Sequence, residues 1–548
     1  MNLPRLLPEK GAETNTDSVV LVVYAPFGTD ESLSTYPDGA SQTLAQHPIY
    51  QGLMQVASHG VHVVALIDRV NDDSWLVDID AGRPQSVQVV SRWKQDMDSP
   101  RTLAGLLRYA HQAHPTSAVV LALEGHGAGF LPELDRRALN LANLTRNGEI
   151  EWRLNTTQGG PYAGPNNPVL PMGSPLLVMG SPLLPMGSPL LPAGGMPLST
   201  WGLGEALRRA VEAGVPKISV IHFDNCFNMS VEVLHTVAPY AHYATGYPNY
   251  NFFTAGQGYP DVFEKLRIAG SATPQVLAQW FAEGNHDVLL PKGHHPTIGC
   301  TVRLSRMHTI AECLDDLADA LLAALRSATT PALRQSVVAK IRHAIIKAQQ
   351  FDVPGASFEL ETPDELTDLY SLASTLLGFD FRPHPVHPAC RALQDALKGI
   401  RQYGDNAIPW VGYGENPPPR WNFSSHQLAM NIFLPDPLLR GLWDWRSPFY
   451  LDVNPDPSQP LVQPHIIDFV KVTDWVDFLI EYHREAKFVG LMPARLPAFP
   501  VFNPGFEPPK RGDDPADPCG DGYDGPAGQG DGGDPKRGNG PAAGGSAA

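Results

Sequence analysis

Cysteine is scarce in this sequence of 548 residues, which contains only five. The five are widely separated and none forms a Cys-x-x-Cys pair, so the sequence predicts neither a disulfide framework nor a zinc-finger-like site. The pattern indicates free thiols in a reducing compartment. We therefore expect a cytoplasmic location.

Basic charge is also in deficit, with 40 Lys and Arg against 57 Asp and Glu and a net charge of -17. Nucleic acids and anionic lipids attract positive patches, so we predict no nucleic-acid partner and no membrane partner. A basic or arginine-bearing partner fits this charge better. No apolar run approaches the ~18 residues of a membrane span. Residues 1–18 lack the apolar segment of a signal peptide, which agrees with a cytoplasmic location.

Glycine and proline, by contrast, are abundant and concentrate in two segments. Residues 131–200 form an insert that repeats Met-Gly-Ser-Pro-Leu-Leu, and the Gly and Pro of each unit exclude a helix there. We interpret the repeat as a duplicated surface loop. Residues 503–548 are rich in Gly, Pro and Asp and poor in apolar residues, which predicts a disordered tail. The expected organisation is an N-terminal extension (1–17), a main domain (18–485) containing the insert, a linker (486–502) and the tail.

Four continuous apolar runs predict strands that are buried on both faces of a parallel sheet. They are Val19–Tyr24, Val61–Ile67, Ala118–Leu123 and Lys217–Phe223. Segments with apolar residues at helical spacing lie between these runs, so we predict an α/β fold with a mostly parallel central sheet. Further helices are predicted within 261–400, notably Met307–Leu325 and Pro363–Leu377, with a strand at Gln427–Leu434 and a helix at Thr473–His483.

Two of the predicted strands end in residues that can do covalent chemistry, His126 and Cys226. The carboxyl ends of parallel strands meet at one edge of a sheet, where α/β proteins place their sites. A cysteine beside a helix N-terminus has a stabilised thiolate, and an imidazole nearby can activate it or protonate a leaving amine. The Gly127 N–H could face a developing oxyanion. Singly, the cysteine suits a buried apolar position and the histidine a turn; together they favour nucleophilic acyl transfer.

Two motifs around these residues resemble the clostripain family of cysteine peptidases. Gly-His-Gly-Ala-Gly-Phe at 125–130 is similar to the family's HGxG motif, and the segment from Asp224 to Val233 resembles its D-A-C-L-M-x-x-x-E-V block. Weaker similarity covers most of residues 18–485. The resemblance implies a caspase-like α/β/α sandwich and a Cys-His dyad. It makes Cys226 the nucleophile, His126 the general acid/base, and the amides of Gly127 and Cys226 the oxyanion donors.

The resemblance also implies specificity. The aspartate two residues before the cysteine, here Asp224, lines the pocket for the residue that precedes the cleaved bond. A carboxylate in a partly desolvated pocket pairs well with guanidinium, so we expect protein or peptide substrates with Arg or Lys at that position. The alternative is that Asp224 caps the following helix. Asn225 and Phe227 depart from the family pattern and could reshape the pocket.

Family members often mature by cleavage between the catalytic histidine and cysteine. Here that stretch offers Arg136, Arg137, Arg146 and Arg153, after which no Lys or Arg occurs from 154 to 207. We therefore expect self-cleavage at Arg146 or Arg153, or none at all.

Other readings remain open at this point. The chain could be a catalytically silent caspase-like module that binds partners through its insert and tail. It could also be a metal-dependent amidohydrolase centred on His294 and His295, although these residues have no cluster of further ligands nearby. We predict no metal site and no cofactor; calcium dependence is known in the family, but the sequence contains no recognisable calcium loop. No feature of the sequence specifies an oligomeric state.

Overall fold

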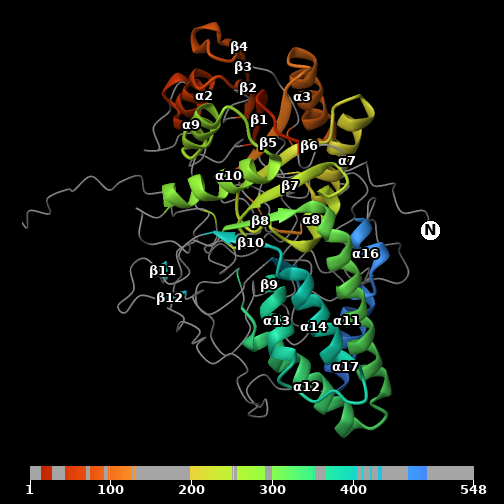
Figure 1. Cartoon of the computed structure of the whole chain (residues 1–548). Coiled ribbons are helices and arrows are strands. Elements are labelled where there is room, and N and C mark those ends of the chain that lie inside the picture. Colours follow the sequence, from red (N-terminus) through yellow and green to blue (C-terminus); the bar gives the residue numbers. More distant parts are fainter. Residues whose placement is uncertain are drawn as a thin grey trace, which may run out of the picture.

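A central β-sheet with helices on both faces forms the main body of this computed structural model (Figure 1). The residues that the structure describes are 14–26, 44–68, 74–91, 97, 99–125, 127, 129–130, 198–249, 251, 256–289, 299–349, 351, 366–403, 410–411, 420–421, 430–434 and 467–489. The tail (503–548), nearly all of the insert and linker, and residues 1–13 of the N-terminal extension lie outside these ranges. Among the described helices, none combines the length and the apolar character needed to span a bilayer.

The sheet has nine strands in the order β10-β8-β7-β6-β5-β1-β2-β3-β4. Its five central strands, from β7 to β2, pair in parallel, and the outer strands pair antiparallel. The strands are β1 (Val19–Pro26), β2 (His62–Asp68), β3 (Trp75–Ile79), β4 (Gln88–Ser91), β5 (Ala118–Glu124), β6 (Ile218–Asp224), β7 (Ala241–Gly246), β8 (Gly299–Arg303) and β10 (Arg401–Tyr403). The four predicted apolar runs are the parallel strands β1, β2, β5 and β6, which confirms the predicted sheet.

Alternate residues of β1 show how the two helical layers arise. Val20, Val22 and Tyr24 belong to one apolar core, and Val19, Leu21 and Val23 belong to another on the opposite face. The first core is covered by α3 (Pro100–Ala113), α7 (Thr200–Glu212) and α8 (Val231–Val237). The second is covered by α2 (Pro48–Ser58), α9 (Tyr259–Ala269) and α10 (Pro274–Leu289). The predicted three-layer α/β/α architecture is therefore confirmed.

A group of helices extends the first core beyond the sheet (Figure 1). It comprises α11 (Met307–Ser327), α12 (Pro331–Lys347), α13 (Leu369–Leu376), α14 (Val386–Leu397), α16 (Asp468–Val472) and α17 (Trp475–Val489). Leucines at helical spacing on α11 are fully buried, because α14 and α17 pack along it. Short 3₁₀ helices occur at Leu44–Gln46, Pro84–Ser86 and Leu304–Arg306, and β11 (Trp410–Val411) pairs with β12 (Arg420–Trp421).

Two sequence predictions in this region are wrong in part. The segment predicted as helix Pro363–Leu377 contains a strand, β9 (Leu366–Asp368), before α13 begins. The predicted strand Gln427–Leu434 is shortened to β13 (Asn431–Phe433), which pairs with β9 in a separate two-stranded sheet. Each strand is too short to show an alternating pattern, and each exists because a distant segment supplies its hydrogen bonds.

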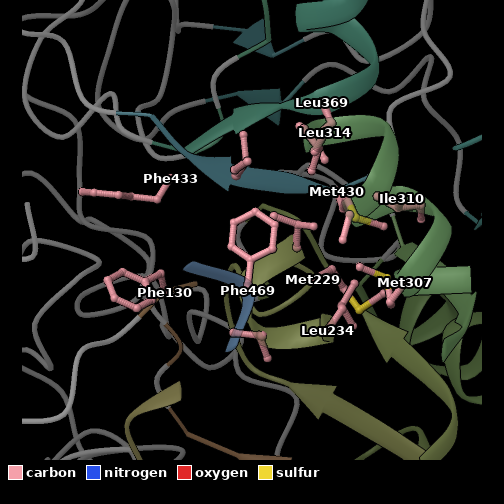
Figure 2. Packing of buried hydrophobic residues seen from close by; sticks show 14 of the residues in the cluster. Phe130, Met229, Leu234, Met307, Ile310, Leu314, Leu369, Met430, Phe433 and Phe469 are labelled. Atoms are coloured by element: carbon pink, nitrogen blue, oxygen red, sulfur yellow. The ribbon is translucent and has the colours of Figure 1, made fainter. Parts of the chain in front are cut away.

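The β9–β13 pair supports the loop between β6 and α8. Asn431 donates from Nδ2 to the carbonyl oxygens of Phe227 (2.8 Å) and Pro248 (2.6 Å). Figure 2 shows Met229 of this loop packed beside Met430 and the α11 residues Met307 and Ile310. The loop that carries Cys226 is thus held against the helical extension of the first core as well as against the sheet.

Candidate active site

The carboxyl ends of β5 and β6 lie side by side and carry the predicted site residues. The two strands are paired in register, with Glu124 opposite Asp224. The chain leaves β5 through Gly125, whose φ of 93° is in the left-handed region that favours glycine. It leaves β6 directly into the loop that holds Cys226. As predicted, the two strand ends meet at one edge of the sheet.

Gly127 lies in very close contact with the backbone of Cys226. A Cβ atom placed on Gly127 would lie 1.9 Å from the Cys226 carbonyl oxygen, 2.9 Å from its carbon and 3.0 Å from its nitrogen. Only glycine fits here, because all three contacts are with backbone that cannot move aside cheaply. The loops after β5 and β6 are therefore packed together at this point. His126, the neighbour of Gly127 in the chain, lies outside the described residues, so its role stays a prediction.

Cys226 lies in the loop before α8 rather than in the first turn of that helix. Its side chain is 3% exposed, and the backbone N–H of Asn251 donates to Sγ over 3.4 Å. The helix begins at Val231 and is capped by the Ser230 hydroxyl, which accepts from Val233 N. The Asn251 carbonyl oxygen also lies 3.4 Å from Sγ, so both polar backbone groups that contact the sulfur come from the segment after β7, which no sequence pattern indicated.

Three other cysteines, Cys300, Cys313 and Cys390, are free thiols, as the sequence predicts. The fifth cysteine, Cys519, lies outside the described residues. A cysteine nucleophile acts as the thiolate, so any chemistry at Cys226 requires its reduced form.

The backbone immediately after Cys226 is strained. Phe227 has a φ of 62°, and it is the one described non-glycine residue with positive φ. The conformation is enforced by the Phe227 N–H, which donates to Asn249 O over 2.9 Å, and by the bond from Asn431 to its carbonyl oxygen. A strained backbone conformation of this kind persists only where surrounding contacts hold it in place. Such residues cluster at active sites.

Asp224 is buried, with 1% of its surface exposed, and neutral donors surround it. Asn251 and Asn285 donate from Nδ2 to its Oδ1 over 2.9 Å and 3.3 Å, and the Tyr259 hydroxyl donates to Oδ2 over 3.3 Å. Ser230 caps α8, so the alternative that Asp224 caps this helix is wrong. Asn251 joins the two predicted residues, because its backbone contacts Cys226 and its side chain contacts Asp224.

Glu124 is a further acidic residue that the sequence analysis missed. It is also 1% exposed, and the Tyr259 hydroxyl donates to its Oε1 over 2.5 Å. Burial, and then the Asp224 carboxylate, raise the pKa of Glu124 well above its usual range. Its place directly after the apolar run Ala118–Leu123 was the available sequence pattern. No local pattern marks Asn251, Tyr259 and Asn285, which come from three other parts of the chain.

His294, His295, Arg146 and Arg153 lie outside the described residues. Cys300 is buried in β8, and burial raises the pKa of its thiol. Within the described ranges, no group of three or more His, Cys, Asp or Glu residues is arranged to hold a metal ion.

The chain has structural similarity, but no detected sequence match, to known proteins. No protein-family model and no curated protein matches it. Its fold is similar to solved structures of C11, or clostripain-family, cysteine proteases. One is a secreted C11 protease from Bacteroides thetaiotaomicron in complex with an irreversible peptide inhibitor. The two sequences are 14% identical, the match covers 79% of this chain and 96% of that chain, and the TM-score is 0.48. Another is an inactive zymogen C11 protease from Parabacteroides distasonis, with 13% identity, coverage of 80% and 97%, and a TM-score of 0.47.

Proposed function

We propose that this protein is a cysteine endopeptidase of the clostripain type that cleaves peptide bonds after Arg or Lys. The observation that carries the proposal is the backbone contact between Gly127 and Cys226. It brings the loop that bears the predicted general acid/base next to the predicted nucleophile. The strained Phe227 backbone and the Asn251 amide beside Sγ agree with a catalytic role for this loop.

The proposed reaction proceeds through a thioacyl-enzyme. The Cys226 thiolate attacks the carbonyl carbon, and the N–H groups of Gly127 and Cys226 bind the resulting oxyanion. The C–N bond then breaks while His126 gives its proton to the leaving amine. Water, activated by His126, attacks the thioester, releases the acid product and returns the proton-bearing thiol. Each step uses groups of the chain itself, and the reaction works in the cytoplasmic, reducing setting expected above.

Asp224 is the proposed basis of specificity. Its buried carboxylate is oriented by the amides of Asn251 and Asn285. A buried carboxylate with fixed hydrogen bonds pairs strongly with a cationic side chain and stabilises a neutral one much less. Substrates with Arg or Lys before the cleaved bond are therefore preferred.

Fluorogenic peptides that differ only in the residue before the cut test this specificity. Under reducing conditions, we expect kcat/KM for Arg and Lys peptides to exceed that for Asp and Leu peptides. Asp224→Ala should lower kcat/KM for the Arg peptide by about 100- to 1,000-fold, the effect of removing one partner of a buried charge pair. Assays with and without calcium test the family's calcium dependence in the same experiment.

Asp261→Ala is the matched control for Asp224→Ala. Asp261 lies in the first turn of α9, close in sequence to Tyr259, but its side chain is exposed. Its removal should leave the preference for Arg unchanged. Equal cleavage of all four peptides would contradict the proposed pocket. No cleavage of any peptide, even after trypsin nicking near Arg146, would instead support the catalytically silent binding module.

Self-processing follows from the same specificity. We expect incubation of the purified protein to produce a new N-terminus after Arg146 or Arg153, because no Lys or Arg follows until Arg208. N-terminal sequencing of the fragments identifies the bond, and Cys226→Ala serves as the uncleaved control. A Cys226-dependent cut within the Met-Gly-Ser-Pro repeat would contradict the assigned specificity.

A further inference from the structure

Glu124 and Asp224 form a pair of buried carboxylates at the ends of β5 and β6. Their Cα atoms are register partners on adjacent parallel strands, so both side chains project from the same face of the sheet. The Tyr259 hydroxyl oxygen lies 2.5 Å from Glu124 Oε1 and 3.3 Å from Asp224 Oδ2. A single hydroxyl group thus contacts both acids.

One carboxylate oxygen of Glu124 lacks a hydrogen-bond partner among the described residues. Its Oε2 is buried and has no hydrogen-bond partner in the part of the chain that the structure describes. An unpartnered buried carboxylate oxygen is costly. Within the described residues, no Lys, Arg or His forms an ion pair with Glu124. The side chain therefore lies ready for a donor that the described structure does not supply.

Titratable groups and amides from several described elements face the pair. β6 contributes His222, whose ring lies near Tyr259, and burial lowers the pKa of His222 to about 4, so it is neutral at physiological pH. From α9 comes Tyr259, whose pKa is raised by burial and by Glu124. α10 and the segment after β7 contribute the amides of Asn285 and Asn251, and also Tyr247, whose pKa is raised by burial and then by Asp224. One proton on Glu124 therefore relieves the repulsion and lets its carboxyl group donate to Asp224.

We infer that Glu124 is a second specificity-determining residue, which joins Asp224 in binding the cationic end of the substrate side chain and releases a proton when that cation arrives. This inference rests on the proposed function and extends it. The proton leaves the Glu124 carboxyl group for solvent, and the carboxylate that remains accepts N–H bonds from the substrate. A guanidinium has five N–H donors in a rigid plane and can engage two adjacent carboxylates, whereas an ammonium has three on one nitrogen. The pair accordingly favours Arg over Lys.

Glu124→Gln is the decisive variant, because glutamine imitates the protonated carboxyl group. Its oxygen can accept from Tyr259 and its amide can donate to Asp224, so the fold is retained. We expect the ratio of kcat/KM for an Arg peptide to that for its neutral citrulline analogue to fall by about 10- to 100-fold, as for a lost charge-assisted hydrogen bond. Glu312→Gln, an exposed change on α11, is the matched control and should leave the ratio unchanged.

Proton release is measured without turnover. The Arg peptide is titrated into Cys226→Ala protein by calorimetry in two buffers of different ionisation enthalpy. We expect close to one proton released per peptide below the pKa of Glu124 and close to none in the Cys226→Ala, Glu124→Gln double variant. As the pH rises through that pKa, Glu124 loses its proton before the peptide binds, so the number of protons released on binding falls. The KM for the Arg peptide should fall over the same pH range. The KM for the citrulline peptide should stay constant.

Tyr259→Phe provides a second test, in which the pH dependence of KM is measured. A purely structural role of Glu124 would leave this pH dependence unchanged. The Tyr259 hydrogen bond lowers the pKa of Glu124, so its removal should shift the pH dependence of KM for Arg to higher pH. The inference is overturned if Glu124→Gln keeps both the Arg/citrulline ratio and the proton release while Asp224→Ala abolishes Arg cleavage. That result would leave the proposed function standing. Absence of both Arg turnover and Arg-peptide binding in wild-type protein would overturn the two together.

Discussion

Replacing Cys226 by alanine is expected to lower kcat/KM for an Arg peptide by about 10⁴-fold or more, the scale of losing a catalytic nucleophile. No other described thiol can substitute for it. Cys300 and Cys390 are buried, and burial raises the pKa of Cys390 to about 12, so both remain protonated and inert. The measurement is steady-state hydrolysis in dithiothreitol, because a cysteine nucleophile reacts only in its reduced form.

Cys313→Ala is the control for this experiment. Cys313 lies on α11, is partly exposed, and has a thiol pKa raised by partial burial and nearby acids, so its removal should leave the activity unchanged. Omitting the reductant should lower the activity of wild-type protein. Hydrolysis that survives Cys226→Ala and disappears with a chelator would contradict the cysteine mechanism and favour a metal centre at His294 and His295.

Gly127→Ala is expected to lower kcat/KM by about 100-fold or more while adding a single methyl group. The new Cβ would lie 1.9 Å from the Cys226 carbonyl oxygen, so the two loops must move apart by an ångström or more. Misplacement of reacting groups by about 1 Å costs on the order of 100-fold in rate. Overpacking should also lower the free energy of unfolding by about 1–3 kcal/mol. Kinetics and thermal unfolding of the same preparation measure both effects.

Gly105→Ala separates this contact from the general effect of adding a methyl group to a glycine. Gly105 lies within α3, and a Cβ there would have no neighbour within 4 Å. Alanine at this helical position should leave the activity unchanged and raise the stability by up to about 1 kcal/mol. Wild-type activity in Gly127→Ala would show that the contact between the loops has no catalytic importance.

Four of the five parallel strands could be predicted because burial on both faces leaves a local trace, whereas the fifth, β7, was missed. Val19–Tyr24 and Lys217–Phe223 are nearly continuous apolar runs, and the structure places them in β1 and β6. Helix α3 was similarly visible, since Ser99 accepts a hydrogen bond from Arg101 N as its N-cap, and Pro100 occupies the first turn. Such features depend on residues adjacent in the chain, so a pattern of a few residues suffices to indicate them.

The short strands were less predictable. The sequence indicated a strand at Gln427–Leu434, which contains β13, but not its partner β9; the two have three residues each and are stabilised by pairing with each other across a long sequence separation. The antiparallel strands β3, β4, β8 and β10 at the sheet edges were also missed. Their hydrogen-bond partners are selected by the folded sheet, and a single short segment does not reveal them.

By itself, the sequence determined the parallel core of the sheet, the loop position of Cys226 and the placement of Asp224 at a strand end. Only the tertiary structure decided what surrounds these residues. Gly127 contacts Cys226 because β5 and β6 are neighbours in the sheet, although the two residues are far apart in the chain. Glu124 acquires its role for the same reason, since register sets it opposite Asp224 and α9 brings Tyr259 between them. Patterns of neighbouring residues encode burial and local hydrogen bonds, whereas a pocket's charge and donors come from side chains that meet only after the chain has folded.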